Sequence, residues 1–372
     1  MKTTLAIVLP LILCASCGPP AEAACAGTSV NAFGAKGDGK TDDTAAIQSA
    51  INAAAAAGGG SVVFNVARYF TTGTFIVPTG VVLCGAIEGP IDITPGANPA
   101  TTVIAPTLLV TNTNAPFITL QGVGAGVTDL LFDYPNQASV TASAPNVYPY
   151  TIVAASPGTK VVRSMVTNAY NFLDIESGRV LAQDLLIGAY HYGINVDHAY
   201  GHVTLRHVSN SVSWDTLENA SNPTTIDNWV ASNGIALVVN RVDGLEVHDF
   251  DVGFRYAGML LTDSPDATQN PRCGFGTVSD TDLDDMVNGV IVTASNTPGY
   301  EFTNLVMGPG ANGQAGVQLK AGGSIAPDVL INGGGASSNG WALGVFLTPA
   351  VGHLTVVNVL GYNTPIPGPC PP

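Results

Sequence analysis

The sequence predicts an all-β protein, a parallel β-helix in which short strands stack as successive coils. The first observation is a repeat, clearest between Gly178 and Val292, in which each copy holds two short apolar stretches, predicted as strands, with a polar or glycine-containing turn between them. It recurs about every 20–30 residues, the repeat length of solenoid proteins. The second is composition: the 372 residues include 43 glycines and 25 prolines, with 46% apolar and 10% charged residues, which suits many tight turns around a large core. One such coil cannot bury its apolar face alone, so the coils must stack.

Two columns of residues mark the predicted bends. In three copies of the repeat, an aspartate stands nine residues before a glycine. The polar column contains Asp184, His207, Asp249, Asp280, Asn304 and Asn358, and the glycine column contains Gly193, Gly234, Gly258, Gly289, Gly316 and Gly344. Asp and Asn tolerate turn conformations, and glycine adopts them freely. Both columns are therefore expected to build the scaffold and to carry no chemistry.

The start of the chain has the pattern of an export signal. A basic start at Lys2 precedes an apolar run from Leu5 to Ala15, and residues 21–23, Ala-Glu-Ala, fit a cleavage site. A lipid anchor on Cys17 is the alternative. Either interpretation predicts a secreted, periplasmic or anchored protein, with residues 1–23 as signal peptide and 24–372 as one β-helix domain, in which 25–84 form the cap and first coils. No apolar run is long enough to span a bilayer.

Four cysteines remain after the signal, namely Cys25, Cys84, Cys273 and Cys370. An even number in an oxidising compartment predicts disulfides and no free thiol, and four cysteines allow three pairings. A Cys25–Cys84 bond would link the first coils. No Cys-x-x-Cys spacing remains that would indicate zinc, and no metal site is assigned.

The segment Asn31–Gln48 predicts a turn followed by a capped helix near Asp42–Ala57. Thr41 or Asp42 is suited to cap the helix, and the glycines at 58–60 would end it. Such a helix would cover the open edge of the first coil. The spacing from Gly34 to Thr41 also matches a phosphate loop, but no buried strand precedes it and the acids that follow would repel phosphate.

The stretch from Asn31 to Val82 resembles the N-terminal signature of the pectate-lyase-like, right-handed parallel β-helix superfamily, which includes rhamnogalacturonase-type glycosidases, alginate epimerases and phage tailspikes. The resemblance implies a right-handed single-stranded β-helix with an N-terminal capping α-helix, and action on a polysaccharide. It does not identify the reaction. The aspartate pairs of polygalacturonase-type enzymes are absent from the matching positions, and Asp197-His198 is only a loose echo of the epimerases' Asp-Pro-His-Glu.

The net charge of the chain limits the classes of macromolecule that it can bind. The net charge is −15 and the 12 Lys and Arg residues are scattered singly, which excludes a nucleic-acid surface. The same scarcity weakens the case for a strongly anionic polysaccharide unless metal ions bridge it. The acidic run Asp280–Asp285 has the alternating pattern of a calcium loop but lacks its glycine and final glutamate. A solvated turn is expected there, with bound Ca²⁺ as the alternative; no other cofactor is expected.

The candidate site lies between Phe172 and Gly234. The coil of His207 reaches its glycine late, and the inserted segment contains Trp214, Asp215, Glu218, Asp227 and Trp229. The insertion is expected to be a loop, and loops on a rigid scaffold often carry function. Asp174 and Asn195 are expected to stack on adjacent coils. Glycoside hydrolysis needs two carboxyl groups about 5–10 Å apart, a separation that coils about 4.8 Å apart can provide.

The candidate catalytic residues are Asp174, Asp197, His198, Asp215 and Glu218, with Asp197 and Asp215 as the leading acids. The candidate substrate-binding residues are Tyr190, His191, Tyr192, Asn195, Trp214, Arg255 and Tyr256. Each acid has a structural alternative as a turn residue. The sequence thus favours a secreted glycoside hydrolase. The alternatives are a polysaccharide lyase, using Arg255 and calcium to neutralise a uronide, and a non-catalytic carbohydrate-binding adhesin.

Overall fold

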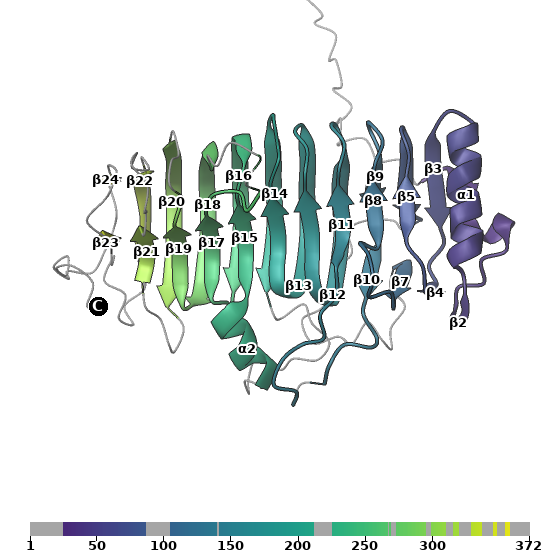
Figure 1. Ribbon diagram of the computed structural model, residues 1–372, viewed down its shortest axis with the longest axis horizontal. Coiled ribbons are helices and arrows are strands. Elements are labelled where there is room, and N and C mark those ends of the chain that lie inside the picture. The colour runs from purple at the N-terminus through teal and green to yellow at the C-terminus, as the bar shows by residue number, and fades with distance from the viewer. Residues whose placement is uncertain are drawn as a thin grey trace, which may run out of the picture.

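The computed structural model describes residues 25–86, 105–139, 141–211, 225–266, 268, 273–294, 299–309, 315–319, 329–336, 345–347 and 354–357. Within them the chain forms a parallel β-helix, so the predicted fold class is confirmed (Figure 1). Coils stack side by side along the long axis of the molecule, and every strand pair has parallel register. Buried aliphatic and aromatic side chains fill the interior along the stack.

Each regular coil contributes to three columns of strands. The first column, here called the front sheet, faces the viewer in Figure 1. It consists of β5 (Phe75–Val77), β8 (Ile118–Leu120), β11 (Tyr150–Ala154), the ends of β12 (Lys160–Ile175) and β13 (Val180–Val196), β15 (Ile235–Val239), β17 (Ala257–Leu261), β19 (Asn288–Val292), β21 (Ala315–Leu319) and β23 (Val345–Leu347).

The other two columns lie before and after the polar bend. The column before it contains β1 (Gly27–Ser29), β3 (Gly60–Phe64), β6 (Val81–Gly85), β9 (Gly126–Thr128), the first parts of β12, β13, β14 (Val203–Ser211), β16 (Val242–Gly253), β18 (Gly274–Met286), β20 (Gly299–Pro309) and β22 (Val329–Ala336), and β24 (Leu354–Val357). The column after it contains β2 (Asp38–Asp42), β4 (Arg68–Thr71), β7 (Thr107–Val110), β10 (Leu131–Asp133) and the later parts of the same long strands.

The predicted polar column forms one bend. Asp184, His207, Asp249, Asp280 and Asn304 all have left-handed backbone conformations, with φ between 48° and 56°. Asn358 lies outside the described residues. The sequence pattern suggested two strands per repeat, but the strand directly after this bend, such as residues 185–187 of β13, is a third one. Its few residues follow the bend without a glycine or proline to separate them, so the pattern merged it with its neighbours.

The glycine column is confirmed at Gly193, Gly258, Gly289 and Gly316, but its assignment at Gly234 is wrong. Because Ile194 pairs with Leu237, Ala236 occupies the column position. Gly344 lies outside the described residues. At Gly193 the absence of a side chain is required, since a Cβ there would overlap the Asn210 side chain.

An α-helix covers the N-terminal end of the stack, as predicted (Figure 1). This helix, α1 (Thr44–Ala56), buries Ile47 and Ile51 and is followed by three glycines with positive φ. It comes after a short 3₁₀ helix, η1 (Val30–Phe33). The backbone N–H groups of Lys36 and Gly37 donate to the Asp43 carboxylate, at 2.6 and 3.0 Å. A carboxylate of the chain therefore occupies donors that a phosphate would need.

A second helix, α2 (Thr225–Asn233), was not predicted. It belongs to the insertion that the sequence suggested would be a loop, and it buries Ile226 and Val230. In Figure 1 it lies beside the N-terminal ends of the front-sheet strands. No helix in the described part of the chain is long and apolar enough to cross a membrane.

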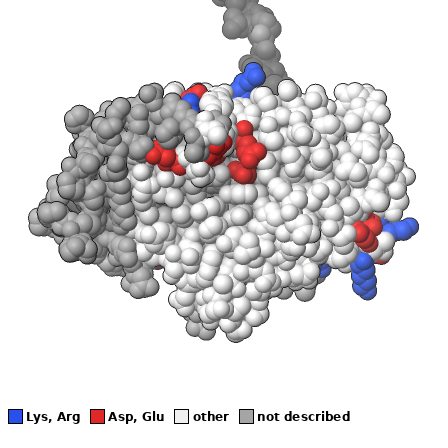
Figure 2. Space-filling view, in the orientation of Figure 1, with Lys and Arg blue, Asp and Glu red and all other residues white. Residues whose placement is uncertain are grey.

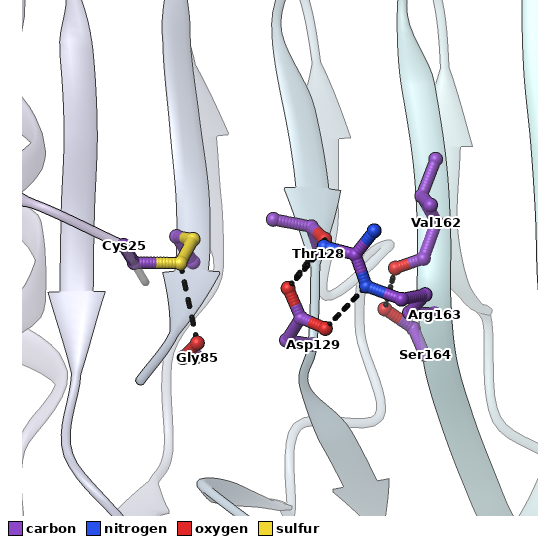
Figure 3. Close-up of a disulfide and its surroundings, with 8 residues drawn as sticks. Cys25, Gly85, Thr128, Asp129, Val162, Arg163 and Ser164 are labelled. Carbon is purple, nitrogen blue, oxygen red and sulfur yellow. Dashed lines mark hydrogen bonds and ion pairs between the residues drawn. A yellow bond between two sulfur atoms is a disulfide. The ribbon is translucent and has the colours of Figure 1, made fainter. Parts of the chain in front are cut away.

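A disulfide joins Cys25 to Cys84 and so links the first strands, as predicted (Figure 3). In the next coils of the same region, the Arg163 guanidinium donates to both oxygens of Asp129, at 2.7 and 2.8 Å. The prediction that no thiol is free is wrong for Cys273, which is buried and unpaired. Its Sγ lies 3.3 Å from the Val239 carbonyl oxygen, so it fills space in the core. Cys370 lies outside the described residues.

Candidate active site

The outer face of the front sheet carries the candidate site. Register pairing confirms that Asp174 lies next to Asn195, as the sequence predicted. Across the coils, the outward position is held in order by Ile76, Thr119, Val153, Asp174, Asn195, Val238, Leu260 and Ile291, and the register places Gln318 and Phe346 at the equivalent backbone positions. Asp174 is the one acid in this row of positions, and apolar residues predominate on its C-terminal side.

A chain of amide hydrogen bonds orients the Asp174 carboxyl group. Asn195 Nδ2 donates to Asp174 Oδ1 at 2.8 Å, and Asn240 Nδ2 donates to Asn195 Oδ1 at 2.7 Å. Because each amide is fixed by the next, Asn195 has its donor turned towards the acid. Asn240 follows β15 directly and was not predicted as a site residue.

The pKa of Asp174 is raised from the ordinary 3.8 to about 7. Burial of the carboxyl group is the main cause, and the negative charges of Glu176 and Asp197 add to it, against the opposing Asn195 hydrogen bond. A carboxyl group of this kind holds its proton near neutral pH and can donate it to a substrate.

Glu176 is an exposed acid that the sequence analysis missed. Ile175 is fully buried, so Asp174 and Glu176 flank it and project towards the same side. A strand advances about 6.6 Å over two residues, which places two carboxyl groups at the separation that glycoside cleavage uses. The alternation of acid, isoleucine and acid at the end of the strand is the signal that would have identified it.

Asp197 and His198 belong to a compact polar group at the C-terminal edge of the front sheet. Asp197 is 6% exposed; its Oδ1 accepts the His198 backbone N–H at 2.8 Å, and its Oδ2 accepts the Ser264 hydroxyl at 2.9 Å. His198 Nε2 lies 3.0 Å from Asp266 Oδ2, and this contact is the main cause of the raised pKa of His198. Ser264 and Asp266 were not predicted, because they lie far away in the sequence.

A group of stacked rings lies at the opposite edge, where the strands begin. The His191 ring stacks between the rings of Tyr170 and Tyr192, at centroid distances of 4.8 and 3.7 Å. The ring centroid of Trp229, on α2, lies 6.0 Å from that of His191. The His191 Nδ1 and the Tyr192 backbone N–H both lie 3.1 Å from Asn171 Oδ1. Burial lowers the pKa of His191 to about 4, so its ring is neutral near pH 7.

Two residues expected to line subsites are buried instead. Tyr190 is 1% exposed and packs against Ile226 and Val230 under α2. Arg255 is fully buried, and its guanidinium donates to the carbonyl oxygens of Ala189 and Asn210. Both side chains support the coils from within, so neither can contact a polysaccharide in this conformation.

The remaining candidates divide into two groups. Tyr256 is half-buried and packs against the same apolar cluster as Leu260 and Tyr192. Trp214, Asp215 and Glu218 lie outside the described residues and stay predictions.

The acidic run Asp280–Asp285 lies away from the front sheet, on β18. Asp280 Oδ1 accepts Asn304 Nδ2 at 2.8 Å, and its Oδ2 lies 3.2 Å from His248 Nδ1, so it is a residue of the polar bend. Among the described residues, the run does not bring three ligand atoms within 4.8 Å of one another. The described part therefore offers calcium no preformed cage at this run.

Charge is distributed unevenly over the face that Figure 2 shows. Acidic side chains gather in its upper part, over the C-terminal ends of front-sheet strands, whereas the described surface below them is uncharged as far as α2. The site thus combines carboxyl groups at one edge with aromatic rings at the other.

The fold and this acidic, aromatic face define a protein of the pectin-lyase-like class. The chain belongs to the rhamnogalacturonase A/epimerase, pectate lyase-like family, whose model matches residues 27–240. Two solved structures are similar in fold. Endo-xylogalacturonan hydrolase from Aspergillus tubingensis has a TM-score of 0.60 at 11% identity, covering 90% of this chain and 93% of its own, and an exopolygalacturonase from Thermotoga maritima has 0.59 at 12%, covering 91% and 89%. Such neighbours are right-handed parallel β-helices, the fold of many polysaccharide-acting enzymes.

Similarity to curated proteins is local. The chain is 47% identical over 68 residues to "Alginate lyase 7" of Azotobacter vinelandii, which is 16% of this chain and 8% of that protein. It is 58% identical over 45 residues to "Mannuronan C5-epimerase AlgE3" of the same organism, or 12% and 2%. The chain thus spans less than a tenth of the length of these relatives.

Proposed function

We propose that this protein is an exported glycoside hydrolase in which Asp174 is the proton donor. The observation that carries the proposal is a carboxyl group on the front sheet whose pKa is raised to about 7 and whose orientation is fixed by Asn195. A general acid works best when its pKa lies near the working pH, because it is then protonated and still able to release its proton. Here it would protonate the glycosidic oxygen as the bond breaks.

Glu176 would supply the second carboxyl group. It is exposed, projects to the same side as Asp174, and would assist attack on the anomeric carbon as a base or nucleophile. Asp197 is proposed as a positioning residue, because its two oxygens are occupied by His198 and Ser264. The contact between His198 and Asp266 would fix the C-terminal edge of the site beside Asp197. Asp215 and Glu218 stay candidates in the inserted segment.

Two further observations bear on the alternatives. A lyase must neutralise a substrate carboxylate, and Arg255, the cation suggested for this role, is buried and hydrogen-bonded to backbone. Hydrolysis is therefore favoured over β-elimination. The Cys25–Cys84 disulfide supports export to an oxidising compartment.

The test measures reducing ends and ultraviolet-absorbing unsaturated products released from a panel of polysaccharides. Wild type should release reducing ends alone. Asp174→Asn and Glu176→Gln should each lower the rate by about 10²–10⁴. Asp251→Asn is the matched control, because Asp251 is an exposed strand acid on another column. Unsaturated products would establish a lyase, and glycan binding without any turnover would establish a binding protein.

A further inference from the structure

The strands of the front sheet contain no basic residue in the described part of the chain. Residues 75–77, 118–120, 150–154, 171–175, 192–196, 235–239, 257–261, 288–292, 315–319 and 345–347 include neither Lys nor Arg. Three of the 12 basic residues, Lys2, Arg272 and Lys320, lie outside the described residues. A face that binds a polyanion normally supplies several cations, so the front sheet lacks the main attraction for one.

Two cations near its edges, Arg255 and Arg241, are already engaged, whereas Arg179, on the turn after β12, is exposed. Arg255 lies under the sheet and donates to backbone carbonyl oxygens. Arg241, just after β15, pairs with Asp243 and stacks on the Tyr200 ring, with its guanidinium carbon 5.1 Å from the ring centroid. His198 gains positive charge on protonation, but Asp197 and Asp266 face it at 3.5 and 3.0 Å.

The charged groups that the front-sheet strands and their C-terminal ends present are mainly acids. Asp174, Glu176, Asp197 and Asp266 lie together at its C-terminal edge, and the pKa of Asp174 already responds to two of them. A polyuronate carries a carboxylate on every sugar and would add like charge to this edge. Each such contact is repulsive unless a metal ion bridges it.

The rest of the face suits uncharged sugar rings. Tyr170, His191 and Tyr192 form a continuous stack, with interplanar angles of 28° and 21°. Trp229 lies 5.9 Å from Tyr170. All four side chains are half-buried, so part of the stack stays accessible. Tyr192 continues into an apolar cluster formed with Ile235, Val238, Ala257, Ile291, Tyr256 and Leu260. Aromatic and apolar side chains pack against the C–H faces of sugars without requiring charge.

We propose that the front sheet binds a neutral polysaccharide, whose sugar rings pack on Tyr170, Tyr192 and Trp229, and does not bind polyuronates. The inference rests on the proposed function in that it takes this face as the substrate face, but it concerns the class of glycan and not the reaction. It therefore predicts binding even for a variant that has lost turnover.

Affinity electrophoresis in native gels tests the inference. Asp174→Asn protein is run through gels containing a neutral glucan, xylan, galactan or mannan, or else polygalacturonate or alginate. At least one neutral polymer should retard it, equally at low salt and in about 0.5 M NaCl, where surface charge is screened. The polyuronates should not retard it, with calcium or with a chelator. Because Asp174→Asn removes one negative charge from the face, it makes binding of a polyuronate easier, and the test is therefore a stringent one.

Substitutions then locate the site. Tyr192→Ala should weaken retardation about tenfold or more, equivalent to about 1.4 kcal/mol. Tyr192→Leu keeps the apolar contact and removes the ring, so it covers the case in which the alanine variant does not fold. Phe275→Ala is the matched control, since Phe275 is an exposed aromatic residue on β18, away from this face.

The outcomes separate the two proposals. Preferential or calcium-dependent retardation by a polyuronate, or no retardation by any polymer, would overturn the inference. Retardation by a neutral polymer that Tyr192→Ala and Tyr192→Leu both leave unchanged would also overturn it. Hydrolysis of a polyuronate refutes the inference and leaves the glycosidase proposal intact, whereas binding of a neutral polymer that is never cleaved does the reverse.

Discussion

Replacing Asp174 by asparagine should both stabilise the protein and lower its turnover by about 10²–10⁴. Asparagine keeps an oxygen to accept the Asn195 hydrogen bond, so the local geometry should survive. It removes a carboxyl group whose pKa is raised from 3.8 to about 7 by burial and by Glu176 and Asp197. A shift of one pKa unit corresponds to about 1.4 kcal/mol, so ionisation of Asp174 lowers the stability of the folded state by up to about 4 kcal/mol.

The sign of the effect depends on pH. Below about pH 4 the carboxyl group is protonated in the folded and unfolded chains, and it costs nothing. As the pH rises to about 7, the unfolded chain loses the proton first, so wild type loses stability relative to the variant. Above about pH 7 the difference is constant. With an unfolding entropy of about 2 cal/mol/K per residue, 4 kcal/mol corresponds to about 5 °C in Tm for a chain of this size.

The assay is thermal unfolding of both proteins from pH 4 to pH 8, together with turnover. The Tm of the variant should exceed that of wild type at pH 8, and the gap should shrink towards pH 4. Wild-type turnover should fall as the pH rises through about 7, because the proton donor is lost. A Tm difference that stays constant with pH, or a variant that keeps wild-type activity, would refute the assigned role.

Three other substitutions test separate parts of the structure. Asp197→Asn should lower Tm, because one of its two buried oxygens becomes an N–H₂ group facing a donor, at about 1–3 kcal/mol; an unchanged Tm with lost turnover would restore the catalytic role that the sequence suggested. Asp249→Val should cost about 1–2 kcal/mol, since its φ of 56° disfavours a branched side chain, and Thr277→Val, on an exposed strand position, should cost far less in chemical denaturation. Cys25→Ser should cost about 4 kcal/mol, given the 59-residue separation of the two cysteines, and a denaturation midpoint equal to wild type would show that the bond does not form.

Features that depend on local chemistry were predictable from the sequence. The polar column was predictable because Asp, His and Asn recur along the repeat and tolerate turns, and the structure gives these residues left-handed backbones. The capping helix was predictable because alanines favour a helix and the glycine run that follows ends it. The contact of Asp174 with Asn195 followed from the same repeat, because parallel register places equivalent residues side by side. These inferences need only the chain's own periodicity.

Features that depend on tertiary packing were not predictable. Gly234 was assigned to the glycine column as a late glycine after the insertion, yet it directly follows α2 and Ala236 takes the column position. Arg255 was a candidate substrate-binding residue, whereas its guanidinium donates to two backbone carbonyl oxygens in the interior. Asp197 was a leading candidate for the catalytic acid, whereas the hydroxyl of Ser264, 67 residues away, donates to its buried carboxylate. For Arg255 and Asp197 the deciding partners are remote in sequence.

The parallel register gives the front sheet a property useful for engineering. Equivalent outward positions recur from one coil to the next at intervals of about 4.8 Å along the molecule. Val238, Leu260 and Ile291 occupy such positions and carry no acid or amide. Exchanging side chains between these positions would move a functional group along a bound glycan in fixed steps while leaving the backbone unchanged. Specificity could thus be changed one coil at a time by substitutions at outward strand positions alone.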